Sequence, residues 1–165
     1  MSKSKTFGFT LIELIIVVAI IALLAAATFV AIDPAKRIGE AQNAQRWSDI
    51  TAILSAIMTY IVDNNGNFPT NITADGTFGI GSGGACDTGD GTAYDACVAT
   101  TITAAACKDI KTDLLETYLA TIPVDPASGL NYDNSGYYYM RSASGRITVG
   151  ACTVYGSGGP IQVSR

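Results

Sequence analysis

The sequence predicts an α+β fold in which a long N-terminal helix, half apolar and half amphipathic, packs on a small antiparallel β-sheet. Residues 14–32 are nineteen residues of which only Thr28 is not apolar. Apolar residues then recur at spacings of three and four as far as residue 62, which is the period of a helix. Two later segments are rich in aromatic and β-branched residues, as strands are. The 165 residues suffice for one modest domain and one additional element.

The apolar run is long enough to cross a membrane. As a helix it spans about 29 Å, close to the thickness of the hydrocarbon layer. Glu13 lies directly before it, and an acidic side chain costs about 2.5–3.5 kcal/mol at mid-bilayer and less near an end. A carboxylate there implies a partner, and the sequence contains no second apolar run to provide one. We therefore expect the partner of Glu13 on another molecule.

Three ordinary interpretations compete for the apolar run. It could be a secretory signal peptide, with Lys3 and Lys5 as the basic region and residues 25–27 (Ala-Ala-Ala) as the cleavage site. It could also be a plain membrane anchor or the buried helix of a soluble protein. A signal peptide or an anchor gains nothing from Glu13, which weakens both.

Residues 8–13, Gly-Phe-Thr-Leu-Ile-Glu, resemble the processing site of type IV pilins and type II secretion pseudopilins. In that family a membrane aspartyl peptidase cuts a short basic leader after the glycine and methylates the new N-terminal amine. The resemblance implies cleavage between Gly8 and Phe9, N-methylation of Phe9 and an assembly role for Glu13. The family's glutamate pairs with the N-terminal amine of a neighbouring subunit, and each buried charge then satisfies the other.

The resemblance also implies a domain organisation. Residues 1–8 are the leader peptide, 9–33 the hydrophobic transmembrane and assembly stem, and 34–63 the amphipathic half of the stem helix. Residues 64–165 form a globular head with a disulfide-bearing loop and a C-terminal β-sheet. This is the pilin-like architecture.

The function implied is that of a prepilin, the structural subunit of a type IV pilus. Its partners are further copies in a helical filament, the prepilin peptidase, the pilus or secretion assembly machinery and, before assembly, the membrane. It would lie in the cytoplasmic membrane as a single-pass protein with the leader inside, then in an extracellular pilus or a periplasmic pseudopilus. Two alternatives stay open: a major-type pseudopilin of a type II secretion system, and an exported or anchored monomeric binding protein whose mature chain begins near Ala27.

The stem departs from the family at two positions. Many pilins carry a glycine and a proline where this chain has Ala22 and Val30, and the first proline here is Pro34. A helix interrupted at its middle is therefore not indicated. Asp33 and Pro34 are typical of an N-cap followed by the first helical residue, so we expect a kink or a restart there.

The remaining elements follow from periodicity. We expect an amphipathic helix over 35–62, ended by residues 64–66 (Asn-Asn-Gly), with Trp47 in the core or in stem packing and Ala44 on the apolar stripe. Residues 72–106 have no clear period. Further along, we predict a helix over 108–119, strands over 136–142 and 146–155 joined by a glycine-containing loop at 143–145, and a third strand at 130–132 or 160–163.

Four cysteines, Cys86, Cys97, Cys107 and Cys152, all lie beyond the apolar run. An even number downstream of an export-type segment indicates disulfides in an oxidising compartment. The sequence leaves all three pairings open, although a short loop closed by Cys86 and Cys97 would gain about 3 kcal/mol. Zinc is disfavoured because no Cys-x-x-Cys pair is present.

Calcium is the one cofactor worth considering, and we assign none. A loop with several acidic residues could supply oxygen ligands, but it lacks EF-hand spacing and is better explained by solvated turns; its residues are Asp87, Asp90 and Asp95. Major pseudopilins bind calcium ahead of their last strands, in a region that corresponds approximately to Asp125, Asn131 and Asp133.

Composition argues against two broad classes of function. The chain has no histidine, which removes the commonest general base and metal ligand, and no nucleophile elbow, P-loop or zinc motif. The formal charge is -4, with no basic stripe after Arg46, so nucleic acid is not an expected partner. We therefore expect a structural protein and not an enzyme.

Overall fold

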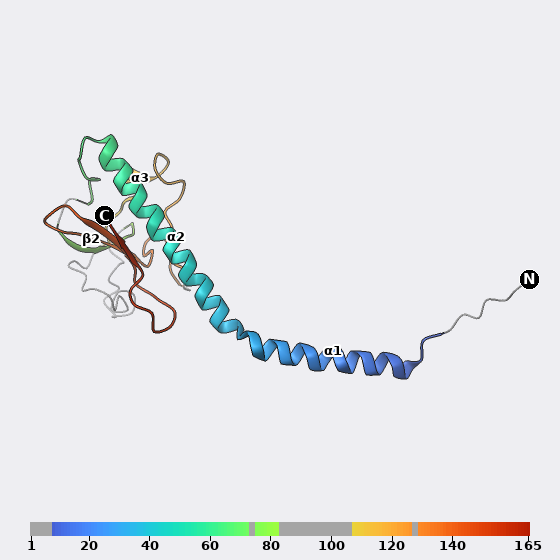
Figure 1. Ribbon diagram of the computed structural model, residues 1–165. Helices are drawn as coiled ribbons and strands as arrows, with labels where there is room; N and C mark the ends of the chain where they lie inside the picture. Colours follow the sequence, from blue (N-terminus) through green and yellow to red (C-terminus); the bar gives the residue numbers. More distant parts are fainter. Residues whose placement is uncertain (1–7, 73–74, 83–106, 127–128) are drawn as a thin grey trace, which may run out of the picture. The chain divides into compact units, whose positions relative to one another are not determined.

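The computed structural model describes four stretches of the chain, residues 8–72, 75–82, 107–126 and 129–165 (Figure 1). The chain divides into two compact units, Met1–Ile38 and Gly39–Arg165. The first contains an apolar helix. The second, which we call the head, contains most of the second helix and the sheet.

The first helix, α1, runs from Leu11 to Ile32 without a break. None of its residues is buried, and it is the one helix in the described part of the chain long and apolar enough to cross a membrane. Its one polar residue beyond the first turn, Thr28, donates its hydroxyl hydrogen to the carbonyl of Ala25 at 2.9 Å, so no side-chain donor is left open. A helix that is apolar on all sides requires non-aqueous surroundings.

The second helix, α2, runs from Pro34 to Asp63 and restarts at the predicted position. Asp33 separates the two helices with a left-handed backbone (φ +46°), and its Oδ1 accepts a hydrogen bond from the backbone N–H of Lys36 at 3.3 Å. Asp33 is therefore the N-cap of α2, and Pro34 is its first residue. The absence of an interruption at Ala22 and Val30 is also confirmed.

The head part of α2 buries one face, which contains Ile50, Ile53, Leu54 and Ile57. The prediction that Ala44 lies on this face was wrong, because Ala44 is exposed. The Trp47 side chain is 45% exposed, so it does not lie in the core of the head, and its packing between stems stays a prediction. The three- and four-residue period continues toward the N-terminus through Arg46, which is buried instead.

The predicted end of α2 at residues 64–66 is confirmed. Asn65 and Gly66 both adopt left-handed backbone angles, with φ +55° and +86°. The N–H of Gly66 donates to the carbonyl of Ile61 at 2.8 Å, which closes the last turn of the helix.

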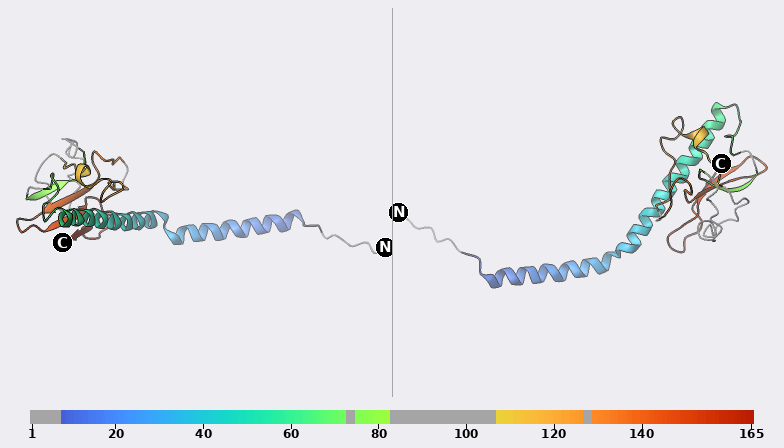
Figure 2. Two further views of the ribbon diagram at one scale, coloured as in Figure 1. Left: turned by 90° about the horizontal axis from the view of Figure 1, so that it is seen from above. Right: turned by 180° about the vertical axis from the view of Figure 1, so that it is seen from behind.

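The sheet contains four antiparallel strands in the order β1-β2-β3-β4, and Figure 2 shows them beside α2 from two further directions. The strands are β1 (Gly76–Gly79), β2 (Tyr137–Arg141), β3 (Ile147–Ala151) and β4 (Gln162–Ser164). The hairpin between β2 and β3 turns at Gly145 (φ +83°), as predicted. The result is the expected α+β architecture.

One row of side chains across the sheet forms the core with α2. Phe78 of β1 lies opposite Tyr139, which lies opposite Val149, and Val149 lies opposite Val163 of β4. The first three are buried, Val163 packs against them, and all belong with the buried face of α2 to one hydrophobic cluster.

The three consecutive tyrosines of β2 alternate between the two faces of the sheet. Tyr137 and Tyr139 are in the core cluster, whereas Tyr138 is buried outside it. The Tyr138 hydroxyl donates to Oε1 of Gln162 at 3.1 Å. Its ring lies against Gly150, where an added Cβ would come within 2.5 Å of the ring.

Three strand predictions need correction. β1 was missed, because its sequence, Gly-Thr-Phe-Gly, is too short to show a period. Residues 130–132 form no strand, because Oδ1 of Asn131 accepts the backbone N–H of Asp133 at 2.8 Å and holds a turn; the fourth strand is instead at the C-terminal candidate. β3 stops at Ala151 and does not reach Tyr155.

The helix predicted over residues 108–119 is only one turn, α3, from Lys111 to Leu114. It does not begin at Lys108, because that residue forms a β-bridge with Ile80 and its carbonyl accepts from the N–H of Gly81 at 3.1 Å, so this carbonyl does not serve a helical hydrogen bond. It cannot continue past Glu116, whose backbone is left-handed (φ +70°). Ile110 and Leu114 nevertheless belong to the core cluster, and Tyr118 and Leu119 pack against it.

Candidate functional site

The first turn of α1 is closed by a capping box formed by Thr10 and Glu13. The backbone N–H of Thr10 donates to Oε2 of Glu13 at 2.8 Å, and the Thr10 hydroxyl donates to the same oxygen at 2.7 Å. In return, the N–H of Glu13 donates to Oγ1 of Thr10 at 3.3 Å. The carboxylate thus lies where the positive end of the helix dipole favours an anion.

Gly8 and Phe9, the predicted cleavage residues, lie just before this turn in exposed chain. The Phe9 side chain is 84% exposed. A Cβ built on Gly8 would meet no atom within 4 Å. The bond between these residues is therefore open on the surface of the chain.

Comparison with protein families gives one match, to a model described as the prokaryotic N-terminal methylation motif, at residues 3–29. The match supports a type IV pilin-like or pseudopilin-like protein. The matched segment contains the Gly8–Phe9 bond, the capping box and most of α1. The motif implies a substrate of the prepilin peptidase that is anchored in a membrane by α1 and assembled into filaments, and it marks a family of structural proteins. No curated protein and no solved structure matches the chain.

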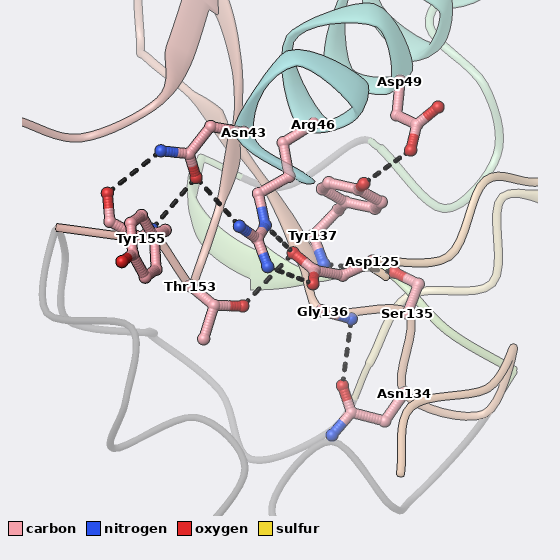
Figure 3. Close-up of polar contacts among 10 residues, drawn as sticks. All are labelled: Asn43, Arg46, Asp49, Asp125, Asn134, Ser135, Gly136, Tyr137, Thr153 and Tyr155. Atoms are coloured by element: carbon pink, nitrogen blue, oxygen red, sulfur yellow. Dashed lines mark hydrogen bonds and ion pairs between the residues drawn. The ribbon is translucent and has the colours of Figure 1, made fainter. Parts of the chain in front are cut away.

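The head of this pilin-like chain contains a buried ion pair between α2 and a loop that precedes the sheet strands β2 and β3 (Figure 3). Nε of Arg46 donates to Oδ2 of Asp125 at 2.7 Å, and a second guanidinium nitrogen donates to Oδ1 at 2.9 Å. The side chains are 3% and 0% exposed. The hydrogen bonds that Arg46 donates to Asp125 raise the pKa of Arg46 above its ordinary value. Such a bidentate pair fixes both distance and orientation.

The residues after β3 complete this network. The Thr153 hydroxyl donates to Oδ2 of Asp125 at 3.2 Å. Asn43 on α2 pairs with the backbone of Tyr155 in both directions, at 2.9 and 3.0 Å, as Figure 3 shows. The Tyr155 ring lies on Gly39, where an added Cβ would come within 2.2 Å of it. These contacts explain why β3 ends early.

A second polar contact joins β2 to α2. The Tyr137 hydroxyl donates to Oδ2 of Asp49 at 2.7 Å. Burial raises the pKa of Asp49 above its ordinary value, and the negative charge of Asp125 adds to this, against the opposing effect of the tyrosine hydrogen bond. Burial and the bond to Asp49 also raise the pKa of Tyr137, so its hydroxyl stays protonated and donates.

The residues considered for calcium do not converge where they are described. Both carboxylate oxygens of Asp125 accept from Arg46, Asn131 holds its own turn, and Asp133 accepts from Ser82. Within the described ranges no three His, Cys, Asp or Glu side chains could hold a metal together. The acidic loop, with Asp87, Asp90 and Asp95, lies outside those ranges.

Two of the four cysteines can be placed. Cys107 and Cys152 are buried, and neither is a free thiol. Cys86 and Cys97 lie outside the described residues, so the pairing stays a prediction.

Sequence reasoning missed the Arg46 network, although one signal was present. Arg46 lies four residues before Ile50 and therefore in phase with the buried face of α2. A charged residue on an apolar stripe requires a buried counter-charge. The partner, Asp125, lies 79 positions away and shows no such pattern.

Replacing Asp125 with Asn should destabilise the head by about 3–5 kcal/mol, because it leaves the buried Arg46 guanidinium without its counter-charge. Urea unfolding of the full chain in detergent micelles, followed by tyrosine circular dichroism, measures this. The matched control is the double variant Arg46→Met, Asp125→Asn, which should lose less than the single variant. A loss below about 1 kcal/mol in the single variant would contradict the buried pair.

The Asp49→Asn variant should become more stable relative to the wild type as the pH rises from 3.8 to neutral. Because the pKa of Asp49 is higher in the folded chain than its ordinary value of 3.8, the folded chain binds this proton more tightly than the unfolded chain. The stability that results is complete below pH 3.8 and is lost as the pH rises through the folded-state pKa. Asparagine cannot ionise, and its oxygen still accepts from Tyr137. A pH-independent difference between the two unfolding free energies would refute this account of Asp49.

Proposed function

We propose that this chain is a prepilin, the precursor of a structural subunit of a type IV pilus. The peptidase cuts between Gly8 and Phe9, methylates the new amine of Phe9, and leaves α1 as the stem through which subunits assemble. The observation that carries the proposal is the match to the methylation motif at residues 3–29, a range that includes Gly8, Phe9, Glu13 and most of the apolar helix.

The environment of Gly8 supports a role in recognition by another protein. Its backbone is not in a left-handed conformation, and no neighbouring atom within 4 Å excludes a side chain. Nothing in the described part of the chain therefore requires glycine at this position. A peptidase that must fit the chain closely through its active site would supply the requirement from outside.

The exposure of α1 supports assembly through this helix. Its large apolar side chains are all about half exposed or more, from 48% at Val17 to 81% at Val30. While the subunit is in the membrane, lipid covers this surface. In a filament, the stems of neighbouring subunits cover it instead, and Glu13 then enters a low-dielectric bundle. There it requires a cation, which the methylated amine of a neighbouring Phe9 provides.

The main alternative is a pseudopilin of a type II secretion system. The segment 118–126 (Tyr-Leu-Ala-Thr-Ile-Pro-Val-Asp-Pro) resembles the stretch that precedes the sheet in many pseudopilins. In the structure Asp125 of this segment accepts hydrogen bonds from Arg46 and fixes the segment to α2. Pilins and pseudopilins share the same processing and stem chemistry, so only the length and location of the filament separate them.

Negative-stain imaging of material sheared from the cell surface should show long fibres that contain this chain. That result supports a pilus. Short fibres confined to the periplasm, with none in the sheared fraction, would instead support the pseudopilin.

The Gly8→Val variant should remain uncut, because a branched side chain beside the scissile bond obstructs the peptidase while no contact in the chain changes. Intact-mass spectrometry of membrane fractions distinguishes the precursor from a chain that begins at a methylated Phe9. Gly159→Val is a matched control, since this head glycine also has no atom within 4 Å of an added Cβ. A normal mature mass for Gly8→Val would contradict the cleavage site, and a chain beginning at Thr28 would identify an exported monomer.

The Glu13→Ala variant should be processed and held in the membrane but absent from filaments. Loss of one partner from a buried ion pair costs about 3–5 kcal/mol, which is more than a hundredfold in assembly. The amounts of chain in sheared and membrane fractions measure this directly. Leu14→Ala, at a neighbouring exposed position, should keep most of the assembly. Filaments of Glu13→Ala in wild-type amounts would remove Glu13 from the assembly site.

A further inference from the structure

The hydrogen bonds that Glu13 makes within its own chain use only half of its carboxylate. Both donors from Thr10, the backbone N–H and the hydroxyl, bind Oε2. Within the described part of the chain, Oε1 accepts no hydrogen bond. One oxygen is therefore fixed against the helix, and the other is open to a donor from outside.

These contacts lie downstream of the proposed cut. The N–H of Thr10 belongs to the peptide bond between Phe9 and Thr10, which is retained when the Gly8–Phe9 bond is hydrolysed. All three hydrogen bonds join residues 10 and 13 and involve no atom of the leader. The mature subunit therefore keeps the same capping box.

We propose that Thr10 is a positioning residue for assembly: it holds Oε2 of Glu13 and thereby presents Oε1 to the N-terminal amine of a neighbouring subunit. This inference rests on the proposed pairing of Glu13. It adds a specific residue through which the orientation of that carboxylate is set before the partner arrives.

The physical advantage is preorganisation. A glutamate side chain has large rotamer freedom, which it must lose when it enters an ion pair. The two Thr10 donors restrict that freedom while the subunit is still in the membrane, so less is lost on assembly. They also supply the carboxylate with donors in an environment without water, where an unsatisfied charge is costly.

A purely structural role for Thr10 makes a different prediction. If Thr10 only capped α1, its loss would weaken the helix equally whether or not residue 13 carried a charge. If it acts through Glu13, its loss should matter only while the carboxylate is present. The two roles are therefore separated by a double-mutant cycle between positions 10 and 13.

The test uses Thr10→Val, which keeps the branched shape and the backbone N–H but removes the hydroxyl. We expect filament incorporation of the processed subunit to fall roughly three- to tenfold, as is typical for loss of a cap. Thr10→Ser, which keeps the hydroxyl, should assemble like the wild type. In a Glu13→Gln background, co-expressed with wild-type subunit so that incorporation of the variant can be measured, Thr10→Val should cause no further fall.

The outcomes distinguish this inference from the proposed function. If Glu13→Ala blocks assembly but Thr10→Val assembles normally, or lowers assembly equally in both backgrounds, the positioning role is wrong and the Glu13 pairing stands. If Glu13→Ala assembles normally, the pairing itself fails.

A second measurement covers a Thr10→Val variant that the peptidase does not cut. In the full-length chain in detergent micelles, Glu13→Gln should accelerate hydrogen exchange at the Thr10 amide, because that amide loses its charged acceptor. Unchanged exchange at this amide would overturn the geometry on which the inference depends.

Discussion

The proposed assembly of this chain depends on one constraint, a carboxylate at the start of a helix that is otherwise apolar on every side. Glu13 is stabilised in its own chain by the donors of Thr10 and by the N-terminal end of α1. That arrangement suffices for a single subunit whose helix end lies near the membrane surface. It does not suffice in a bundle of packed stems, because a charge buried there requires an opposite charge.

The head solves a similar problem in the opposite way. Arg46 and Asp125 are both buried, but each finds its counter-charge within the same chain. The pair joins α2 to the segment before β2, and Asn43 and Thr153 extend it to the residues after β3. Within the head, this directional ion pair fixes the segment before β2 against α2 more strictly than apolar packing does.

The sequence predicted the elements with strong local signals. The apolar run, the restart at Asp33 and Pro34, the end of α2 and the hairpin at Gly145 each depend on one residue type at one position, and each was confirmed. What failed depended on distant partners. β1 exists because β2 pairs with it, and α3 is short because Lys108 bonds to β1. Arg46 is buried because of Asp125. Periodicity carries no information about such contacts. On α2 the side chain of Trp47 is exposed, and the neighbouring residue Arg46 is buried instead.

The most direct test is a structure of the assembled filament at a resolution that shows side chains. If Glu13 pairs as proposed, its carboxylate lies within about 4 Å of the methylated amine of Phe9 on an adjacent subunit. A filament in which this carboxylate faces lipid or water, with no amine near it, would contradict the account.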